Sequence, residues 1–212
     1  MYVPSQFSES RVAVLQQLVR EHSLATLVTL GADGLKANHI PMELDPEPAP
    51  HGTLRGHVAR ANPVWRDHLP DVEALAVFQG PRAYITPSWY RTKLETGKVV
   101  PTYNYAVVHA RGPLRIVDDP AWLRALVERL TRMHESSRPQ PWQVSDAPEE
   151  FVASQLHAIV GIEIAVTRLV GKWKVSQNRP AVDRAGVADG LRGSAGADAA
   201  AMARLVEESM RS

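Results

Sequence analysis

Short runs in which apolar and polar residues alternate recur along this chain, and such alternation predicts β-strands with one buried face. The clearest pair is Leu24–Leu30 and Leu35–Leu44, which flank Gly31 and Gly34. Glycine adopts the positive φ that a short reversal requires, so this pair predicts a β-hairpin. Further strands are expected at 53–58, 73–79, 83–86, 104–117, 162–166 and 170–175. Strands therefore make up most of the expected elements.

A helical period replaces the alternation in several places. Asp119-Pro120 begins the clearest helix, because aspartate caps a helix and proline suits its first position. Leu123, Leu126 and Leu130 then follow on one face of that helix. Other helices are expected over 9–22, 63–69, 146–159 and the alanine-rich end, 199–212. The Gly- and Ala-rich stretch 181–198 is expected to be a loose linker.

Together these elements predict an α+β fold that is mainly β, a β-barrel with added helices. With 212 residues the chain is long enough to bury a full core. One domain is expected over residues 1–180, with a helical insertion at 119–160. The linker and the carboxyl-terminal helix, 181–212, would follow it.

Charge is balanced over the whole chain but not along it. The 24 basic and 23 acidic residues give a net charge of +1, which argues against wholesale binding of a polyanion such as DNA. Residues 55–115 carry nine basic and four acidic side chains, and 164–212 carry eight and five, whereas 1–54 and 116–163 are net acidic. The positive charge is thus concentrated in two segments.

The first basic segment also holds most of the aromatic rings. These are Trp65, Phe78, Tyr84, Trp89, Tyr90, Tyr103 and Tyr105. A ligand with a planar ring and a phosphate would use this combination, because rings stack on flat faces and phosphates need N–H donors. A barrel core with a solvated basic rim would give the same pattern, and composition does not choose between the two.

Several classes of site are not expected. The chain has no cysteine, no apolar run of the roughly 18 residues that would span a membrane, and no leader-like start, so we expect a cytoplasmic protein. His39, His57 and His109 lie in expected strands without the pairing typical of a metal site, and none is expected. The sequence contains neither a G-x-S-x-G elbow nor a glycine-rich phosphate loop, which argues against hydrolase and Rossmann-type sites.

Four stretches combine aromatic, basic and amide or hydroxyl side chains. They are Gly56–Trp65, Gly80–Tyr90 followed by Lys93, Val100–Tyr105 and Gly171–Pro180. In the first, a helix start at Asn62-Pro63 stands beside Arg60, and free N–H groups next to a guanidinium suit an anion. A capped helix with a surface arginine is the alternative interpretation.

Six stretches resemble, in order, the PaiB-type FMN-binding negative transcriptional regulators: MYVPSQF, GHVARANPVW, GPRAYITPSWY, VPTYNY, LTRMHE and GKWKVSQNR. The resemblance runs from Met1 to about Leu191. It implies a split β-barrel of the flavin-reductase and pyridoxamine-phosphate-oxidase type, a homodimer, and FMN held at the dimer interface. The Arg-x-His pair by which pyridoxamine-phosphate oxidases hold their substrate has no counterpart, so that reaction is not expected.

The resemblance also implies which residues hold the cofactor. The strand 37–42 would lay its backbone along the flavin ring, and Arg60 with Lys93 would pair with the phosphate. The basic stretch near the end would close the cleft from the partner subunit. The full set of expected FMN contacts is Asn38, His39, Ile40, Pro41, His57, Ala59, Arg60, Asn62, Ser88, Trp89, Lys93, Lys174, Ser176, Gln177, Asn178 and Arg179.

Three functions follow from this, and the sequence leaves them open. The first is an FMN-binding, flavin-linked regulator. The second is an FMN-dependent oxidoreductase of the NAD(P)H flavin-reductase type, for which the sequence indicates no catalytic residue. The third, a repressor that contacts DNA directly, is disfavoured because no helix-turn-helix with a basic second helix is found.

Overall fold

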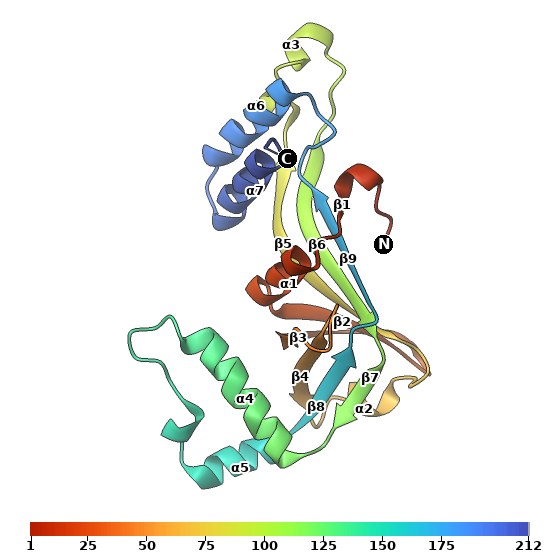
Figure 1. Ribbon diagram of the computed structural model, residues 1–212, viewed down its shortest axis with the longest axis vertical. Coiled ribbons are helices and arrows are strands. Elements are labelled where there is room, and N and C mark those ends of the chain that lie inside the picture. Colours follow the sequence, from red (N-terminus) through yellow and green to blue (C-terminus); the bar gives the residue numbers. More distant parts are fainter. Residues whose placement is uncertain (212) are drawn as a thin grey trace. The chain divides into compact units, whose positions relative to one another are not determined.

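The structure, a computed structural model, describes residues 1–211 (Figure 1). The chain divides into two compact units. The first unit comprises residues 1–18, 79–108 and the chain from Val170 onward, and the second comprises 19–78 and 109–169. Each unit is therefore assembled from segments that lie far apart in the sequence.

The described residues form a nine-stranded sheet in the order β1-β9-β6-β5-β2-β3-β4-β8-β7. The strands are β1 Ser8–Glu9, β2 Leu24–Gly31, β3 Gly34–Asp45, β4 Thr53–Ala59, β5 Ala74–Ile85, β6 Thr102–Gly112, β7 Leu114–Val117, β8 Ile159–Ala165 and β9 Arg168–Lys174. The pairings β1–β9, β2–β3, β2–β5, β3–β4, β4–β8 and β7–β8 are all antiparallel.

Helices and short 3-10 turns connect these strands. The helices are α1 Val12–Glu21, α2 Val64–Asp67, α3 Lys93–Thr96, α4 Pro120–Glu135, α5 Glu149–His157, α6 Ala181–Arg192 and α7 Ala197–Glu208. The 3-10 turns are η1 Ser5–Phe7, η2 Pro87–Trp89 and η3 Val144–Asp146. No helix in residues 1–211 is both long and apolar enough to cross a bilayer.

The second unit is built on the β2–β3 hairpin. Its reversal lies at Gly31–Gly34, where Gly34 has a φ of +112°, as the sequence predicts. Helix α4 begins at its Asp119 cap, whose carboxylate accepts hydrogen bonds from the backbone N–H of Ala121 and Trp122. Its buried face carries Leu123, Leu126 and Leu130, as the sequence predicts.

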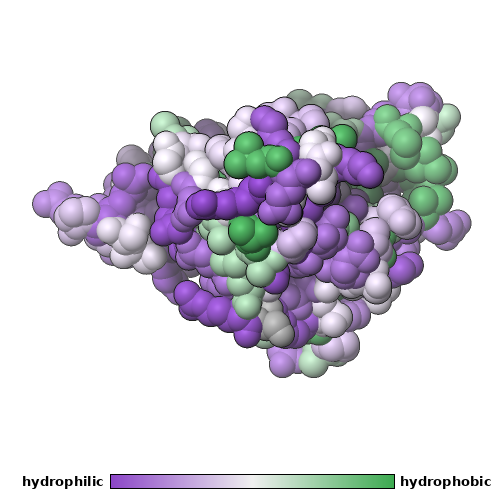
Figure 2. Space-filling model, turned by 90° about the horizontal axis from the view of Figure 1, so that it is seen from above, coloured by the Kyte–Doolittle hydropathy of each residue, from purple (hydrophilic) through white to green (hydrophobic). Residues whose placement is uncertain are grey.

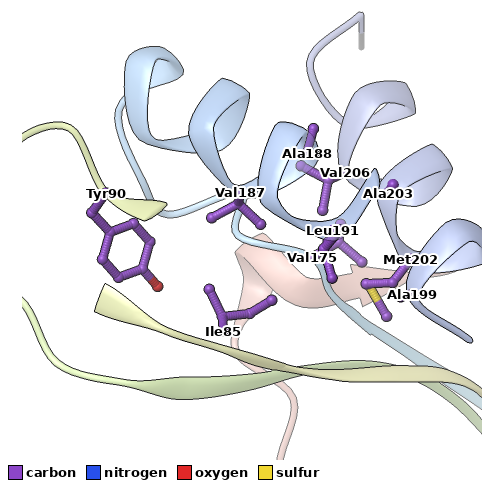
Figure 3. Close-up of a cluster of buried hydrophobic side chains, with 10 residues drawn as sticks. All are labelled: Ile85, Tyr90, Val175, Val187, Ala188, Leu191, Ala199, Met202, Ala203 and Val206. Atoms are coloured by element: carbon purple, nitrogen blue, oxygen red, sulfur yellow. The ribbon is translucent and has the colours of Figure 1, made fainter. Parts of the chain in front are cut away.

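The core of the first unit lies between strands β5 and β9 and the helices α6 and α7 (Figure 3). The buried side chains that form it are Ile85, Tyr90, Val175, Val187, Ala188, Leu191, Ala199, Met202, Ala203 and Val206. Burial of each large apolar side chain contributes about 1.5–3 kcal/mol to the free energy of folding.

Seen from the end that carries α3, the surface is mostly hydrophilic with separate hydrophobic areas (Figure 2).

Three expectations about single elements are wrong. The stretch 181–198 is not a loose linker, because Ala181–Arg192 forms α6 and α7 begins at Ala197. Residues 73–79 and 83–86 are one strand, β5, that continues through Gly80-Pro81. The long strand expected over 104–117, with a bulge or bend at Gly112-Pro113, is divided there into β6 and β7, because Pro113 cannot donate to a ladder. Residue 212, at the end of the expected last helix, lies outside the described residues.

Candidate functional site

The expected cofactor residues fall into both units, and each group is described by itself. Residues 38–62 belong to the second unit. Residues 88–93 and 174–179 belong to the first unit. Within each unit the structure brings several of these residues together.

In the second unit, Asn38 and Asn62 meet. The Asn62 amide donates a hydrogen bond of 2.8 Å to the Asn38 side-chain oxygen, and the Asn62 oxygen accepts one of 3.0 Å from the N–H of Val64 at the start of α2. Strand β3 alternates its side chains, so His39 and Pro41 are exposed while Ile40 is buried. Asn38 therefore lies on the Asn62 side of β3, opposite to His39.

Arg60 is held by internal partners. Its guanidinium donates to both oxygens of Asp118 at 2.6 and 2.9 Å, and to the backbone oxygens of His157 and Ile159 at 2.8 and 3.0 Å. This pairing lowers the pKa of Asp118 and raises that of Arg60, chiefly through the shared hydrogen bonds. Its predicted contact with a phosphate would have to compete with this network.

His57 lies half-buried on β4, and Ala59 is exposed at the end of the same strand. The Nδ1 atom of His57 is buried and has no hydrogen-bond partner in the described part of the chain. Burial lowers the pKa of His57, so its imidazole is neutral at pH 7. A neutral ring with one unused nitrogen suits a hydrogen bond to a polar ligand.

In the first unit, a pocket of about 530 Å³ holds three of the expected residues, Ser88, Trp89 and Lys93. Its other lining residues are Tyr90, Arg91, Leu94, Gly186, Asp189 and Gly190. A Cβ on Gly190 would lie 2.3 Å from the Trp89 ring, so the indole packs directly on the backbone of α6. The Gly-x-x-x-Gly spacing of Gly186 and Gly190 is present in the sequence, but it does not by itself indicate which side chain packs on it.

The stretch 174–179 forms a rigid turn. Ser176 adopts a φ of +68° and is buried against Asn104, whose amide donates a 2.9 Å hydrogen bond to the Ser176 hydroxyl. Gln177 accepts from the N–H of Val175 at 2.8 Å and donates to the backbone oxygen of Trp173 at 2.6 Å. These bonds fix the turn and leave the side chain of Asn178 exposed.

Two cations of this stretch contact neighbouring side chains, Arg179 an aromatic ring and Lys174 a hydroxyl. The Arg179 guanidinium is 4.7 Å from the ring centroid of Tyr90, which is 2% exposed and whose buried hydroxyl has no hydrogen-bond partner within residues 1–211. Lys174 donates a hydrogen bond to the Thr102 hydroxyl. Its pKa is lowered, mainly by burial and further by the charges of Lys172 and Arg179.

The residues present fit a flavin nucleotide. In the first unit, cations beside aromatic rings match a phosphate joined to a planar ring. In the second unit, the Asn38–Asn62 pair and the unused His57 nitrogen offer hydrogen bonds to a polar ring edge. Within the described residues no group of three His, Cys, Asp or Glu side chains could hold a metal ion.

Comparison with known proteins identifies the family. Residues 1–168 match the family described as "Putative FMN-binding domain". Protein PAI 2 of Bacillus subtilis, named for protease synthase and sporulation, is 32% identical and covers 100% of this chain and 99% of its own. The chain belongs to the PaiB family of FMN-binding proteins. The Emericella nidulans protein AN0679 is also similar, at 37% identity over 98% of this chain and 97% of its own length.

Solved structures show that this PaiB-family protein shares the flavin-binding split-barrel fold. The flavocytochrome Anf3 of Azotobacter vinelandii matches with a TM-score of 0.58 at 8% identity, over 79% of this chain and 69% of its own. The FAD and heme binding protein of Mycobacterium smegmatis matches with a TM-score of 0.57 at 15% identity, over 80% and 74%. The predicted fold class, family and cofactor are therefore confirmed. The individual contact residues remain predictions, and those at 174–179 lie beyond the matched region.

Proposed function

We propose that this protein is a cytoplasmic, homodimeric, flavin-linked regulator that binds FMN and acts without contacting DNA directly. The observation that carries the proposal is the cluster of Lys172, Lys174 and Arg179 beside the rings of Tyr90 and Tyr105, in a chain of an FMN-binding family. The name of the Bacillus subtilis relative, which refers to protease synthesis and sporulation, supports a regulatory role.

The outer face of the β2–β3 hairpin supports the homodimer. Its cross-strand pairs include Leu24 with Pro41, Val28 with Ala37 and Leu30 with Leu35. Leu24 is 60% and Leu35 is 78% exposed. An exposed apolar sheet face is typical of a protein interface, and a two-fold axis would pair the same face of two copies.

An FMN-dependent oxidoreductase of the NAD(P)H flavin-reductase type is the second candidate. The pocket beside Trp89 favours it, because Arg91 and Lys93 at its wall offer charges to a phosphate-bearing electron donor. In either case the flavin supplies the redox chemistry when it is bound, and the protein binds, orients and tunes it.

Titration with FMN tests the proposal. We expect quenching of flavin fluorescence that saturates at one FMN per chain, and a yellow protein after removal of free flavin. Unquenched flavin at micromolar protein would contradict it. Anaerobic mixing with NADPH then separates the two candidates, since rapid bleaching of the flavin absorbance supports the reductase and persistence of the colour supports the regulator.

A further inference from the structure

We infer that Lys172, Lys174 and Arg179 hold the phosphate of the flavin nucleotide, and that the rings of Tyr84, Tyr103 and Tyr105 form the adjoining ring-binding face. The inference rests on the proposed FMN binding and names its phosphate end. It assigns the phosphate to these three cations of the first unit instead of to Arg60, which lies in the second unit.

The cluster carries positive charge without a counter-ion. In the described part of the chain, none of the three side chains forms an ion pair with a carboxylate, whereas Arg55 pairs with Asp45 and Glu163. Lys172 instead donates to the backbone oxygen of Tyr2 at 3.2 Å. Neighbouring cations repel one another, and a doubly charged phosphate would relieve that repulsion.

The carboxylate of Asp183, in the same unit, is already engaged. It is 1% exposed, and its two oxygens accept hydrogen bonds from the N–H and the hydroxyl of Thr92 at 3.0 and 2.7 Å. Asp183 lies in the first turn of α6, and the positive end of that helix adds to the stabilisation of its charge.

The donors of the cluster are available. An ammonium has three donors, and Lys174 gives one of them to Thr102. The Arg179 guanidinium lies 4.7 Å from the ring centroid of Tyr90. A guanidinium has five N–H donors, enough to serve a phosphate beside that contact. By contrast, Arg60 already uses four N–H bonds to Asp118 and two backbone oxygens.

The ring-binding face follows from strand alternation. Ala83, Ile85, Trp173 and Val175 point toward the α6–α7 core. The intervening residues of β5 and β9 therefore point to the opposite side of the sheet. There Tyr84 and Tyr103, 50% and 57% exposed, form an edge-to-face pair 5.7 Å apart, and Lys172 lies 5.4 Å from the Tyr105 ring centroid. An exposed aromatic surface beside a cation suits a planar ring that carries a phosphate.

The test compares FMN with riboflavin, which has the same ring but no phosphate. Equilibrium binding of both flavins is measured by fluorescence for the wild-type protein and for Lys174→Gln, Arg179→Gln and Arg60→Gln. Arg204→Gln is the control, because it removes one charge from an exposed position of α7 in the same unit.

We expect Lys174→Gln and Arg179→Gln each to weaken FMN binding about tenfold, as for loss of a charge-assisted hydrogen bond. Riboflavin binding should stay within about twofold, which also shows that the variants are folded.

Arg60→Gln and Arg204→Gln should leave the preference for FMN over riboflavin unchanged, and Arg179→Lys should recover part of the lost FMN affinity. Loss of the preference in Arg60→Gln alone, or equal binding of FMN and riboflavin by the wild-type protein, would overturn the phosphate assignment while leaving flavin binding intact. Failure of the wild-type protein to bind either flavin would overturn the proposed function and the assignment with it.

Discussion

The packing of Trp89 depends on two positions of α6 that carry no side chain. Its indole lies on α6 where Gly186 and Gly190 leave the helix backbone bare. A Cβ at Gly186 would approach the Trp89 backbone oxygen to 2.1 Å, and one at Gly190 would approach the ring to 2.3 Å. These glycines cost helix propensity, and the close packing against η2 offsets that cost. The pocket that contains Ser88 and Lys93 therefore has a fixed wall.

Gly190→Ala should destabilise the protein. The methyl group has no space beside Trp89, and overpacking of this kind costs about 1–3 kcal/mol, more than the gain in helix propensity of about 1 kcal/mol. The urea midpoint of unfolding measures the effect. Gly193→Ala is the matched control, because its added Cβ would meet no atom closer than 3.6 Å. Equal midpoints for the two variants would show that the indole is not packed as described.

Strands β4 and β6 each carry a partly buried histidine of the second unit, His57 and His109 respectively. Each has a buried Nδ1 without a hydrogen-bond partner among the described residues. Burial is the main cause that lowers the pKa of both below the ordinary value of about 6.5. The folded state therefore binds fewer protons than the unfolded state just below that pH.

The free energy of unfolding should consequently be highest above about pH 6.5 and should decline as the pH falls toward the lowered pKa values of the two histidines. Urea midpoints measured from pH 8 to pH 5 follow the decline. The double variant His57→Gln, His109→Gln should show a flatter profile between pH 6.5 and 5 and a parallel one above pH 7. A wild-type profile that rises with acidification would contradict the burial of these rings.

Local sequence predicts these elements unevenly. The hairpin β2–β3 and helix α4 carry clear periodicity, glycines in the turn and a capping residue, and both form as predicted. Helix α6 was missed because its glycines, Gly186 and Gly190, are explained only by their contact with Trp89, far away in the chain. A glycine-rich stretch can be a flexible linker or a tightly packed helix. The residues next to it in the sequence do not show which, because the contacting side chain comes from a distant part of the chain.

The same limit applies to the candidate site. Its polar and basic stretches, its family and its cofactor could be predicted from side-chain chemistry and motif order. The partners of individual residues could not, because Asp118 lies 58 positions from Arg60, and Ser176 lies 72 positions from Asn104. A sequence does not show whether an arginine is paired with a carboxylate. Only the fold shows that Arg60 is paired with Asp118 and that Arg179 forms no ion pair among the described residues.

The whole molecule is proposed to be a pair of chains that each bind a flavin. The exposed apolar face of the β2–β3 hairpin needs a cover, and the proposed dimer supplies one. Leu35→Glu should place a charge on that face and shift the protein toward monomers at micromolar concentration. Leu94→Glu is the control, since Leu94 is 93% exposed on α3 in the other unit. Light scattering after size exclusion reports the mass of both variants.

Native mass spectrometry of the protein after reconstitution with FMN tests cofactor binding and dimerisation together. We expect an assembly of two 23.3 kDa chains with two bound FMN molecules. The flavin should stay with the dimer when free FMN is removed. A single chain, or a dimer that carries no flavin, would contradict the proposal of an FMN-binding homodimer.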